Sequence, residues 1–145
     1  MADTRAGKVF SKACILTRDH FFVKKIVDAN SDKLIIIVDE SKMVEQLGNF
    51  PLPVEVVPSG WELTAKQISD LGAVPKLRKR DGDIFISNNG NYILDCKFKV
   101  ISNPQKLHSQ LKQLIGVVET GLFIGMTDLV IVGSQESVKI LENKQ

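Results

Sequence analysis

The sequence predicts an α/β fold, because an amphipathic helical pattern is followed directly by the pattern of a buried strand. Four apolar residues recur at helical spacing: Phe22, Val23, Ile26 and Val27. Residues 34–38 form a continuous apolar run, β-branched at all but its first residue, which is typical of a parallel strand buried on both faces. The chain has 145 residues, 43% of them hydrophobic and 25% charged, which indicates one globular domain and excludes collagen, disorder and coiled coil.

Polar residues bracket the first predicted helix. Thr17 and Asp19 precede it, and the Asn-Ser-Asp sequence of residues 30–32 is a stop signal. Asp19 is favoured as a helix cap or a first-turn acid that the helix dipole stabilises, while a role as general base stays open. Lys24 and Lys25 are expected on the solvated face of this helix.

The middle of the chain predicts a second helix flanked by strands. Prolines at both ends of residues 51–58 predict an edge strand or a sheet boundary. Residues 61–71 have helical spacing, and Gly72 is placed to cap the helix at its C-terminus. The basic residues 76–80 predict an exposed edge strand that charge protects from pairing.

Antiparallel strands and a third helix follow. The dipeptide at residues 81–82 is Asp-Gly, a tight-turn signal, and residues 84–86 and 92–98 predict two paired strands. Residues 88–91, Asn-Asn-Gly-Asn, join the two strands, and a hairpin loop that needs positive φ explains these residue types. An Asn-Pro pair at residues 103–104 begins a helix. Its expected apolar stripe is Leu107, Leu111, Leu114 and Ile115, and strands are expected at 117–124, 129–132 and 137–141.

Composition limits the classes of function. With 19 basic and 17 acidic residues the net charge is +2, and without an arginine stripe a nucleic-acid partner is not expected. The cysteines and histidines form no metal-ligand or disulfide pattern; they are Cys14, Cys96, His20 and His108. We therefore expect no metal, and we expect the two cysteines to be small buried hydrophobic residues. The longest apolar run is too short to span a membrane, and no signal peptide is evident. We therefore expect a cytoplasmic protein with a small-molecule partner.

One position is suggestive of an anion site. Ligands in open α/β sheets bind beyond the carboxyl ends of parallel strands, and Lys42 follows the buried run 34–38 at that point. An ammonium group there is suited to a phosphate or an anionic intermediate. A merely solvated turn lysine is the alternative.

Four ordered segments carry a resemblance to a known family. They are residues 38–42 with 47–48 (Val-Asp-Glu-Ser-Lys and Leu-Gly), 50–58, 88–95 and 116–123. In order and spacing they resemble type A ribose-5-phosphate isomerase, over residues 33–141. The resemblance implies a partial Rossmann-like parallel sheet, residues 1–50 and 117–145, with an inserted ferredoxin-like α+β subdomain, residues 51–116. The family's N-terminal half, with its phosphate loop, has no counterpart in the sequence.

The resemblance also implies a reaction and its residues. The reaction is the interconversion of ribose 5-phosphate and ribulose 5-phosphate, in the pentose phosphate pathway, through an enediolate and without a metal or organic cofactor. Lys42 matches the family's substrate-contacting lysine, and Lys12 and Asp3 are further substrate contacts. Asp19 would be the base, with aspartate in place of the family's glutamate and a short insertion after it, whereas the gap-free register places Lys24 at that position.

Other interpretations stay open. The chain is a shortened or divergent isomerase, a catalytically inactive relative that acts as a sugar-phosphate-binding or assembly module, or a piece of a longer enzyme. A homo-oligomer is expected, because the strand at residues 34–38 and the first helix otherwise expose apolar surface.

Overall fold

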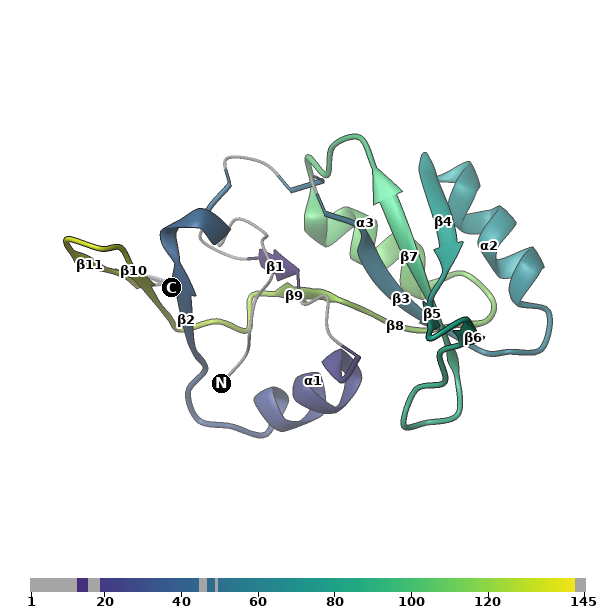
Figure 1. Ribbon diagram of the computed structural model, residues 1–145, viewed down its shortest axis with the longest axis horizontal. Helices are drawn as coiled ribbons and strands as arrows, with labels where there is room; N and C mark the ends of the chain where they lie inside the picture. The colour runs from purple at the N-terminus through teal and green to yellow at the C-terminus, as the bar shows by residue number, and fades with distance from the viewer. Residues whose placement is uncertain (1–12, 16–18, 45–46, 49, 143–145) are drawn as a thin grey trace.

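The computed structural model describes residues 13–15, 19–44, 47–48 and 50–142. Helices and strands are interspersed along the chain, as the predicted α/β class requires (Figure 1). In chain order the elements are β1 (Ala13–Ile15), α1 (Phe21–Ala29), β2 (Ile35–Asp39), the 3-10 helix η1 (Glu40–Lys42), β3 (Leu52–Val56), α2 (Trp61–Asp70), β4 (Ala73–Leu77), β5 (Lys79–Arg80), β6 (Asp83–Ile84), β7 (Tyr92–Phe98), α3 (Pro104–Lys112), β8 (Val117–Thr120), β9 (Leu122–Ile124), β10 (Leu129–Gly133) and β11 (Val138–Glu142).

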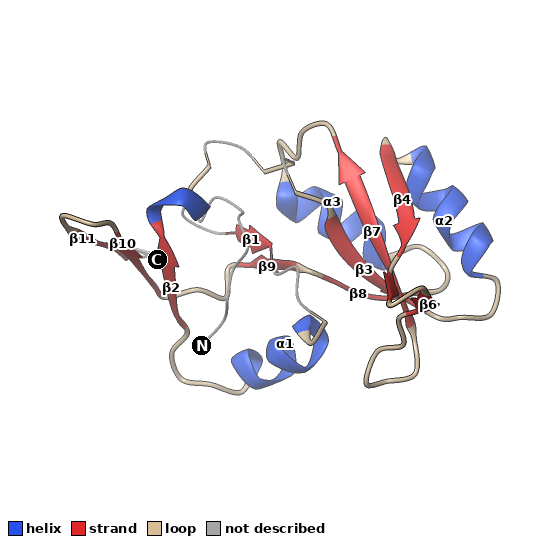
Figure 2. Cartoon of the chain, in the orientation of Figure 1, coloured by secondary structure: helices blue, strands red, loops and turns tan. Residues whose placement is uncertain are grey.

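The larger sheet has the order β4-β7-β3-β8, and neighbouring strands are antiparallel. The succession β3-α2-β4-β7-α3-β8 is the βαββαβ arrangement of ferredoxin-like folds, as the resemblance implies. Helices α2 and α3 pack against this sheet and add Ile68, Leu107 and Leu111 to its core (Figure 2). Ile115, expected in the apolar stripe of α3, lies beyond the helix end and is 83% exposed.

Strand β3 lies inside this sheet, so the prediction of an edge strand is wrong. All five of its residues are buried, with β7 on one side and β8 on the other. Pro53 is tolerated because the ladder to β8 begins only at Val54, opposite Thr120, and the N–H of Gly121 donates to the Pro53 carbonyl at 2.8 Å. The prolines of this segment therefore mark strand ends and not a sheet edge.

Strand β4 lies at one edge of the larger sheet, which confirms the expected edge strand for residues 76–77. The following residues 79–80 form β5, which pairs with β6 in a short hairpin. The predicted pairing of residues 84–86 with residues 92–98 is therefore wrong, because β7 pairs instead with β3 and β4.

The smaller sheet has the order β11-β10-β2, with β2 and β10 parallel. Along β2 exposure alternates: Ile36 and Val38 are 1% and 6% exposed, whereas Ile35 and Ile37 are 46% and 54% exposed. The prediction that this strand is buried on both faces is wrong, since no described element packs over its second face. The β-branched residues of β2 therefore indicate that the segment forms a strand, but they do not indicate that both of its faces are buried.

Helix α1 forms as predicted, but its apolar stripe does not face a core. Phe21 is fully buried in the cluster beneath the smaller sheet. Val23, Ile26 and Val27 are 41%, 51% and 57% exposed. Helical spacing fixes which residues share a face, but it does not supply a partner for that face.

The local signals at Gly72, Asn103 and residues 81–82 are confirmed. The N–H of Gly72, at φ +97°, closes the last turn of α2. The Asn103 side chain accepts a hydrogen bond from the Lys106 N–H at 3.0 Å and caps α3. Asp81 and Gly82, at φ 53° and 85°, make the hairpin turn between β5 and β6.

Two apolar cores hold the structure together, one under each sheet. Cys14 and Cys96 are buried in them as free thiols, as predicted, and burial raises the pKa of Cys14 to about 12. Strand β8 pairs with β3, so residues 117–120 belong to the larger sheet, while the exact subdomain boundaries stay a prediction. Across the described part of the chain, no helix is long and apolar enough to cross a membrane.

Candidate active site

The carboxyl edge of the parallel pair β2-β10 presents the first candidate group. The ladder places Asp39 and Gly133 opposite each other where both strands end, and Lys42 is the last residue of η1, which follows β2 directly. The Asp39 carboxylate accepts the Ser41 N–H at 2.8 Å. Hydrogen bonds from the Ser41 side chain and from its backbone N–H lower the pKa of Asp39. Among the described residues, half-buried Lys42 has no hydrogen bond or ion pair, so its ammonium is available to an anion.

Asp19 lies just before α1 and is held by two arginines. Arg78 donates to its carboxylate at 2.9 Å, and Arg80 binds the other oxygen. The residue at the N-cap position is His20, so the prediction that Asp19 caps the helix is wrong. Both oxygens of this carboxylate are therefore occupied by guanidinium groups.

Arg78 links this pair to the larger sheet. It donates to Asp95 through Nε at 2.9 Å and through Nη2 at 2.5 Å, in a bidentate contact. Its side chain is only 14% exposed, against 21% for Asp19 and 27% for Asp95. Arg78 therefore ties the segment before α1 to strand β7, a role that its basic sequence context did not indicate.

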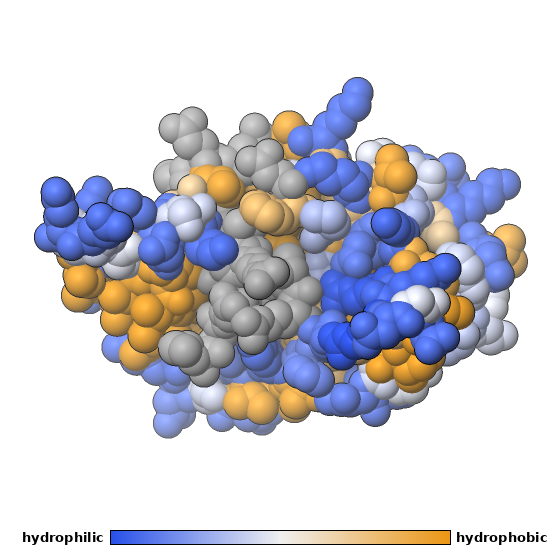
Figure 3. All heavy atoms as spheres, viewed as in Figure 1, coloured by the Kyte–Doolittle hydropathy of each residue, from blue (hydrophilic) through white to orange (hydrophobic). Residues whose placement is uncertain are grey.

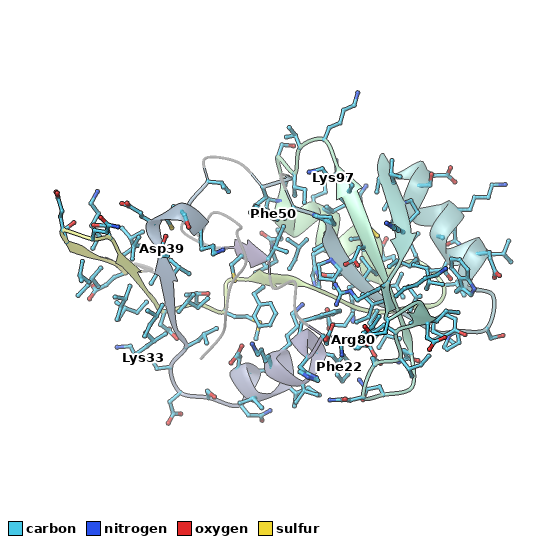
Figure 4. The ribbon with its side chains drawn as sticks, in the orientation of Figure 1. Phe22, Lys33, Asp39, Phe50, Arg80 and Lys97 are labelled. Carbon is cyan, nitrogen blue, oxygen red and sulfur yellow. The ribbon has the colours of Figure 1, made fainter. Side chains whose placement is uncertain are left out.

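The structure does not bring Asp19 and Lys42 together. No hydrogen bond or ion pair joins them in the described part of the chain. Figure 4 shows Arg80, the partner of Asp19, well separated from Asp39 at the end of β2. The other two predicted substrate contacts, Lys12 and Asp3, lie outside the described residues.

A buried carboxylate that the sequence did not single out orders the loop before β7. Glu55 is 2% exposed, and its Oε1 accepts hydrogen bonds from Ser87 at 2.7 Å, Asn91 at 3.0 Å and Asn89 at 3.3 Å. Among residues 87–91 only Gly90 has positive φ, so backbone strain does not explain the asparagines. Asn89 and Asn91 serve as donors to a buried carboxyl group, which must be hydrogen-bonded to be tolerated.

The same loop reaches the start of α1. The Asn88 side chain lies 3.1 Å from His20 Nδ1, one residue from Asp19. A single glutamate in the apolar run of residues 52–57 was the signal in the sequence for this network. The loop and the arginines therefore fix the position of Asp19 from two sides.

A second buried cluster joins α1 to β8 and α3. Lys25 donates to Glu119 at 2.9 Å and to the Thr120 carbonyl at 3.0 Å, and Lys112 lies 3.3 Å from the other Glu119 oxygen. Lys25 is 13% exposed, so its predicted place on a solvated face is wrong. His108 Nδ1, 2.8 Å from the Thr120 hydroxyl, completes the cluster.

Burial and pairing act differently on the groups of this cluster. Burial lowers the pKa of Lys25 more than its bond to Glu119 raises it. Burial alone would raise the pKa of Glu119, but hydrogen bonds from Lys25 and the Thr120 N–H outweigh it, so that the net pKa is lowered. Burial, with the positive charge of Lys25, lowers the pKa of His108. The cluster is a structural ion pair network that favours ionised Glu119.

We expect the Glu119 contribution to stability to depend on pH. Because the folded-state pKa is below the ordinary value of 4.5, the stabilisation is present above that value and is lost as the pH falls through the folded-state pKa. Glu119→Gln should therefore lower the free energy of unfolding by about 1–2 kcal/mol at neutral pH, and by less in acid. Urea unfolding of both proteins across this pH range measures the effect. An equal loss at every pH would contradict it, and Glu142→Gln, an exposed carboxylate on β11, is the control.

The chemistry of the described side chains points to anion binding. No group of three or more His, Cys, Asp or Glu residues that could hold a metal ion occurs within the described ranges. Lys42 lies after the end of β2, whereas Arg78 and Arg80 lie near the start of α1 and are paired with the carboxylates of Asp19 and Asp95. Of these three cations, Lys42 is the one suited to an anionic ligand.

Comparison with known proteins identifies the family. Residues 12–137 match the family model described as ribose 5-phosphate isomerase A (phosphoriboisomerase A). Ribose-5-phosphate isomerase A 1 of Oceanobacillus iheyensis is 50% identical over 119 residues, which cover 82% of this chain and 53% of the relative. Ribose-5-phosphate isomerase A of Gloeobacter violaceus is 49% identical over 119 residues, which cover 81% of this chain and 52% of that protein.

Solved structures agree with the sequence relatives. Ribose 5-phosphate isomerase A of Methanocaldococcus jannaschii superposes with a TM-score of 0.87 at 33% identity, covering 96% of this chain and 63% of the other. A D-ribose-5-phosphate isomerase in complex with phospho-erythronic acid gives 0.85 at 36% identity, covering 90% and 58%. This chain spans about half the length of the curated relatives it matches. The sequence, the ferredoxin-like subdomain and the parallel pair together establish that the chain belongs to the ribose 5-phosphate isomerase A family.

Proposed function

We propose that the protein catalyses the interconversion of ribose 5-phosphate and ribulose 5-phosphate at the carboxyl edge of the β2-β10 pair. Family membership is the observation that carries this proposal. The position of Lys42 at that edge supports it, because a cation beyond the carboxyl ends of parallel strands is suited to a phosphorylated substrate. A structural relative in complex with phospho-erythronic acid, a phosphorylated sugar acid, agrees with this class of ligand.

The reaction needs a base and a group that stabilises negative charge. A carboxylate removes the proton on the carbon next to the carbonyl, an enediolate forms, and the proton returns to the neighbouring carbon. We assign Lys42 to the substrate or its enediolate, where an ammonium offsets the developing negative charge. The whole reaction moves one proton from carbon to carbon and a second from the hydroxyl oxygen to the former carbonyl oxygen, and it needs no external oxidant or reductant.

Asp19 is the proposed base, on the resemblance of residues 17–19 to the family's catalytic segment. Its ion pairs with Arg78 and Arg80 occupy both carboxylate oxygens. Arg80 is 59% exposed, so its contact is the one that a substrate displaces at least cost. If Asp19 is the base, the substrate must therefore displace Arg80 from the Asp19 carboxylate.

The proposal is tested with the purified 145-residue chain and ribose 5-phosphate. We expect formation of ribulose 5-phosphate, followed by its absorbance or by a coupled assay, and saturable binding of the sugar phosphate by calorimetry. Binding without turnover would indicate that the protein binds the sugar phosphate but does not catalyse its isomerisation. A chain that neither binds nor converts the sugar phosphate would contradict the proposal.

A further inference from the structure

His20 begins α1, but its side chain has no role in the helix. The residue occupies the N-cap position, where its backbone carbonyl accepts the Lys24 N–H at 3.0 Å, and its side chain makes no capping hydrogen bond. The side chain is exposed, so packing in a core does not account for it either. It comes directly after Asp19, the proposed base. The imidazole is therefore a polar group at the candidate site that the fold of α1 does not need.

Asn88 selects one form of this imidazole. Its side-chain nitrogen lies 3.1 Å from Nδ1 of His20. An amide nitrogen only donates hydrogen bonds, so Nδ1 accepts, and the proton of the neutral ring lies on Nε2. Nε2 has no hydrogen-bond partner within the described ranges. The ring therefore presents Nε2–H as an unused donor.

The loop that carries Asn88 is held by a buried carboxyl group. Glu55 accepts hydrogen bonds from three side chains of residues 87–91. Inside the loop, the Ser87 N–H donates to the Asn91 carbonyl at 2.8 Å. Of these five described residues, Asn88 is the one whose side chain bonds to α1. Because a hydrogen-bonded network of buried groups rigidifies its segment, the loop holds the Asn88 amide in a fixed position.

Asp19 and His20 bond to neighbouring parts of the ferredoxin-like subdomain. Asp19 is paired with Arg78 at 2.9 Å. The Arg78 carbonyl accepts the N–H of Phe85 at 3.0 Å, two residues before the loop that contacts His20. Figure 3 shows hydrophilic surface over β5 and β6, toward the start of α1. The carboxylate and the imidazole therefore lie beside one polar region, which suits a phosphorylated sugar.

We propose that His20 is a second catalytic residue, whose Nε2–H donates a hydrogen bond to the substrate carbonyl oxygen, and that Asn88 is the positioning residue that keeps Nε2 protonated. As Asp19 removes the proton from carbon, negative charge develops on that oxygen, and a hydrogen-bond donor stabilises it. The imidazole keeps its own proton in this step, so the balance of the reaction is unchanged. This role rests on the proposed function, with Asp19 as the base.

The form of the ring is measured without turnover. Nitrogen-15 NMR at about pH 9, where histidine rings are neutral, should show the Nε2–H form of His20. Asn88→Asp should convert it to the Nδ1–H form, because a carboxylate only accepts and Nδ1 must then donate. The signals of His108, the other histidine of the chain, are the internal control and should not change. An Nδ1–H form in the wild type would overturn the role of Asn88.

Kinetics test the role of His20 in the reaction. His20→Ala should lower kcat for ribose 5-phosphate by about 100-fold and change KM by less than about threefold, because the hydrogen bond strengthens in the transition state. His20→Gln, whose amide nitrogen also donates, should recover part of the loss. Asn88→Asp should lower kcat too, although it leaves His20 in place. His108→Gln, the same change at the other histidine, should keep kcat within about twofold.

Circular dichroism and urea unfolding should show that the variants fold, since the side chains of His20 and Asn88 are both exposed. Without turnover by the wild type, the proposed function fails, and this role of His20 fails with it. With turnover by the wild type, an unchanged kcat in His20→Ala overturns this role alone. So does an Asn88→Asp protein that has the Nδ1–H form and the wild-type kcat.

Discussion

Replacing Lys42 with alanine is expected to lower kcat/KM for ribose 5-phosphate by at least about 100-fold, provided that the chain turns over this substrate. The Lys42 ammonium follows the carboxyl edge of β2-β10 and has no hydrogen bond or ion pair with another described residue, so the substrate loses its counter-charge there. The loss should appear in kcat as well as in KM, because the enediolate carries more negative charge than the sugar. Steady-state kinetics of the two proteins measure both parameters.

The control for this variant is Lys66→Ala, which removes an exposed lysine on α2 in the other subdomain. It should leave kcat/KM within about twofold, a difference that corresponds to less than 1 kcal/mol. Wild-type kinetics in the Lys42→Ala protein would show that Lys42 does not contact the substrate. Asp19→Asn, assayed beside it, should lower kcat by about 100-fold or more if Asp19 is the base.

Replacing Arg78 with alanine is expected to lower the free energy of unfolding by about 3 kcal/mol. The substitution leaves the carboxylates of Asp19 and Asp95 without the guanidinium that contacts both, at sites where the three side chains are 14–27% exposed. Removal of one partner from a well-buried ion pair costs about 3–5 kcal/mol, and the partial exposure here favours the lower end. Urea unfolding at neutral pH measures the change.

Arg80→Ala is the matched control for Arg78→Ala. Arg80 binds the same Asp19 carboxylate, but it is 59% exposed, so its loss should cost about 0.5 kcal/mol or less. Equal losses for the two variants would contradict the view that Arg78 is the structural link. Arg78→Ala should also reduce activity if Asp19 is the base, since the start of α1 would lose its tie to β7.

Features that depend on a few neighbouring residues follow from the sequence. The caps at Gly72 and Asn103 and the Asp-Gly turn at residues 81–82 act through hydrogen bonds or backbone angles within one turn, so their residue types suffice. The alternation of helix and strand patterns predicts the α/β class for the same reason. Lys42 was placed correctly at the end of β2 because the position depends on one strand and the turn after it.

Features that depend on distant residues were decided only by the tertiary structure. Glu55 and Ser87 are 32 positions apart, and Lys25 and Glu119 are 94 apart, so no local pattern connects them. Burial follows the same rule: β3 is interior because β8 returns to it, and β2 exposes Ile37 because no described element covers that face. The sequence alone determined where elements begin, end and turn, since those interactions are local. Which faces are covered and which charges are paired was decided by the packing of segments far apart in the chain.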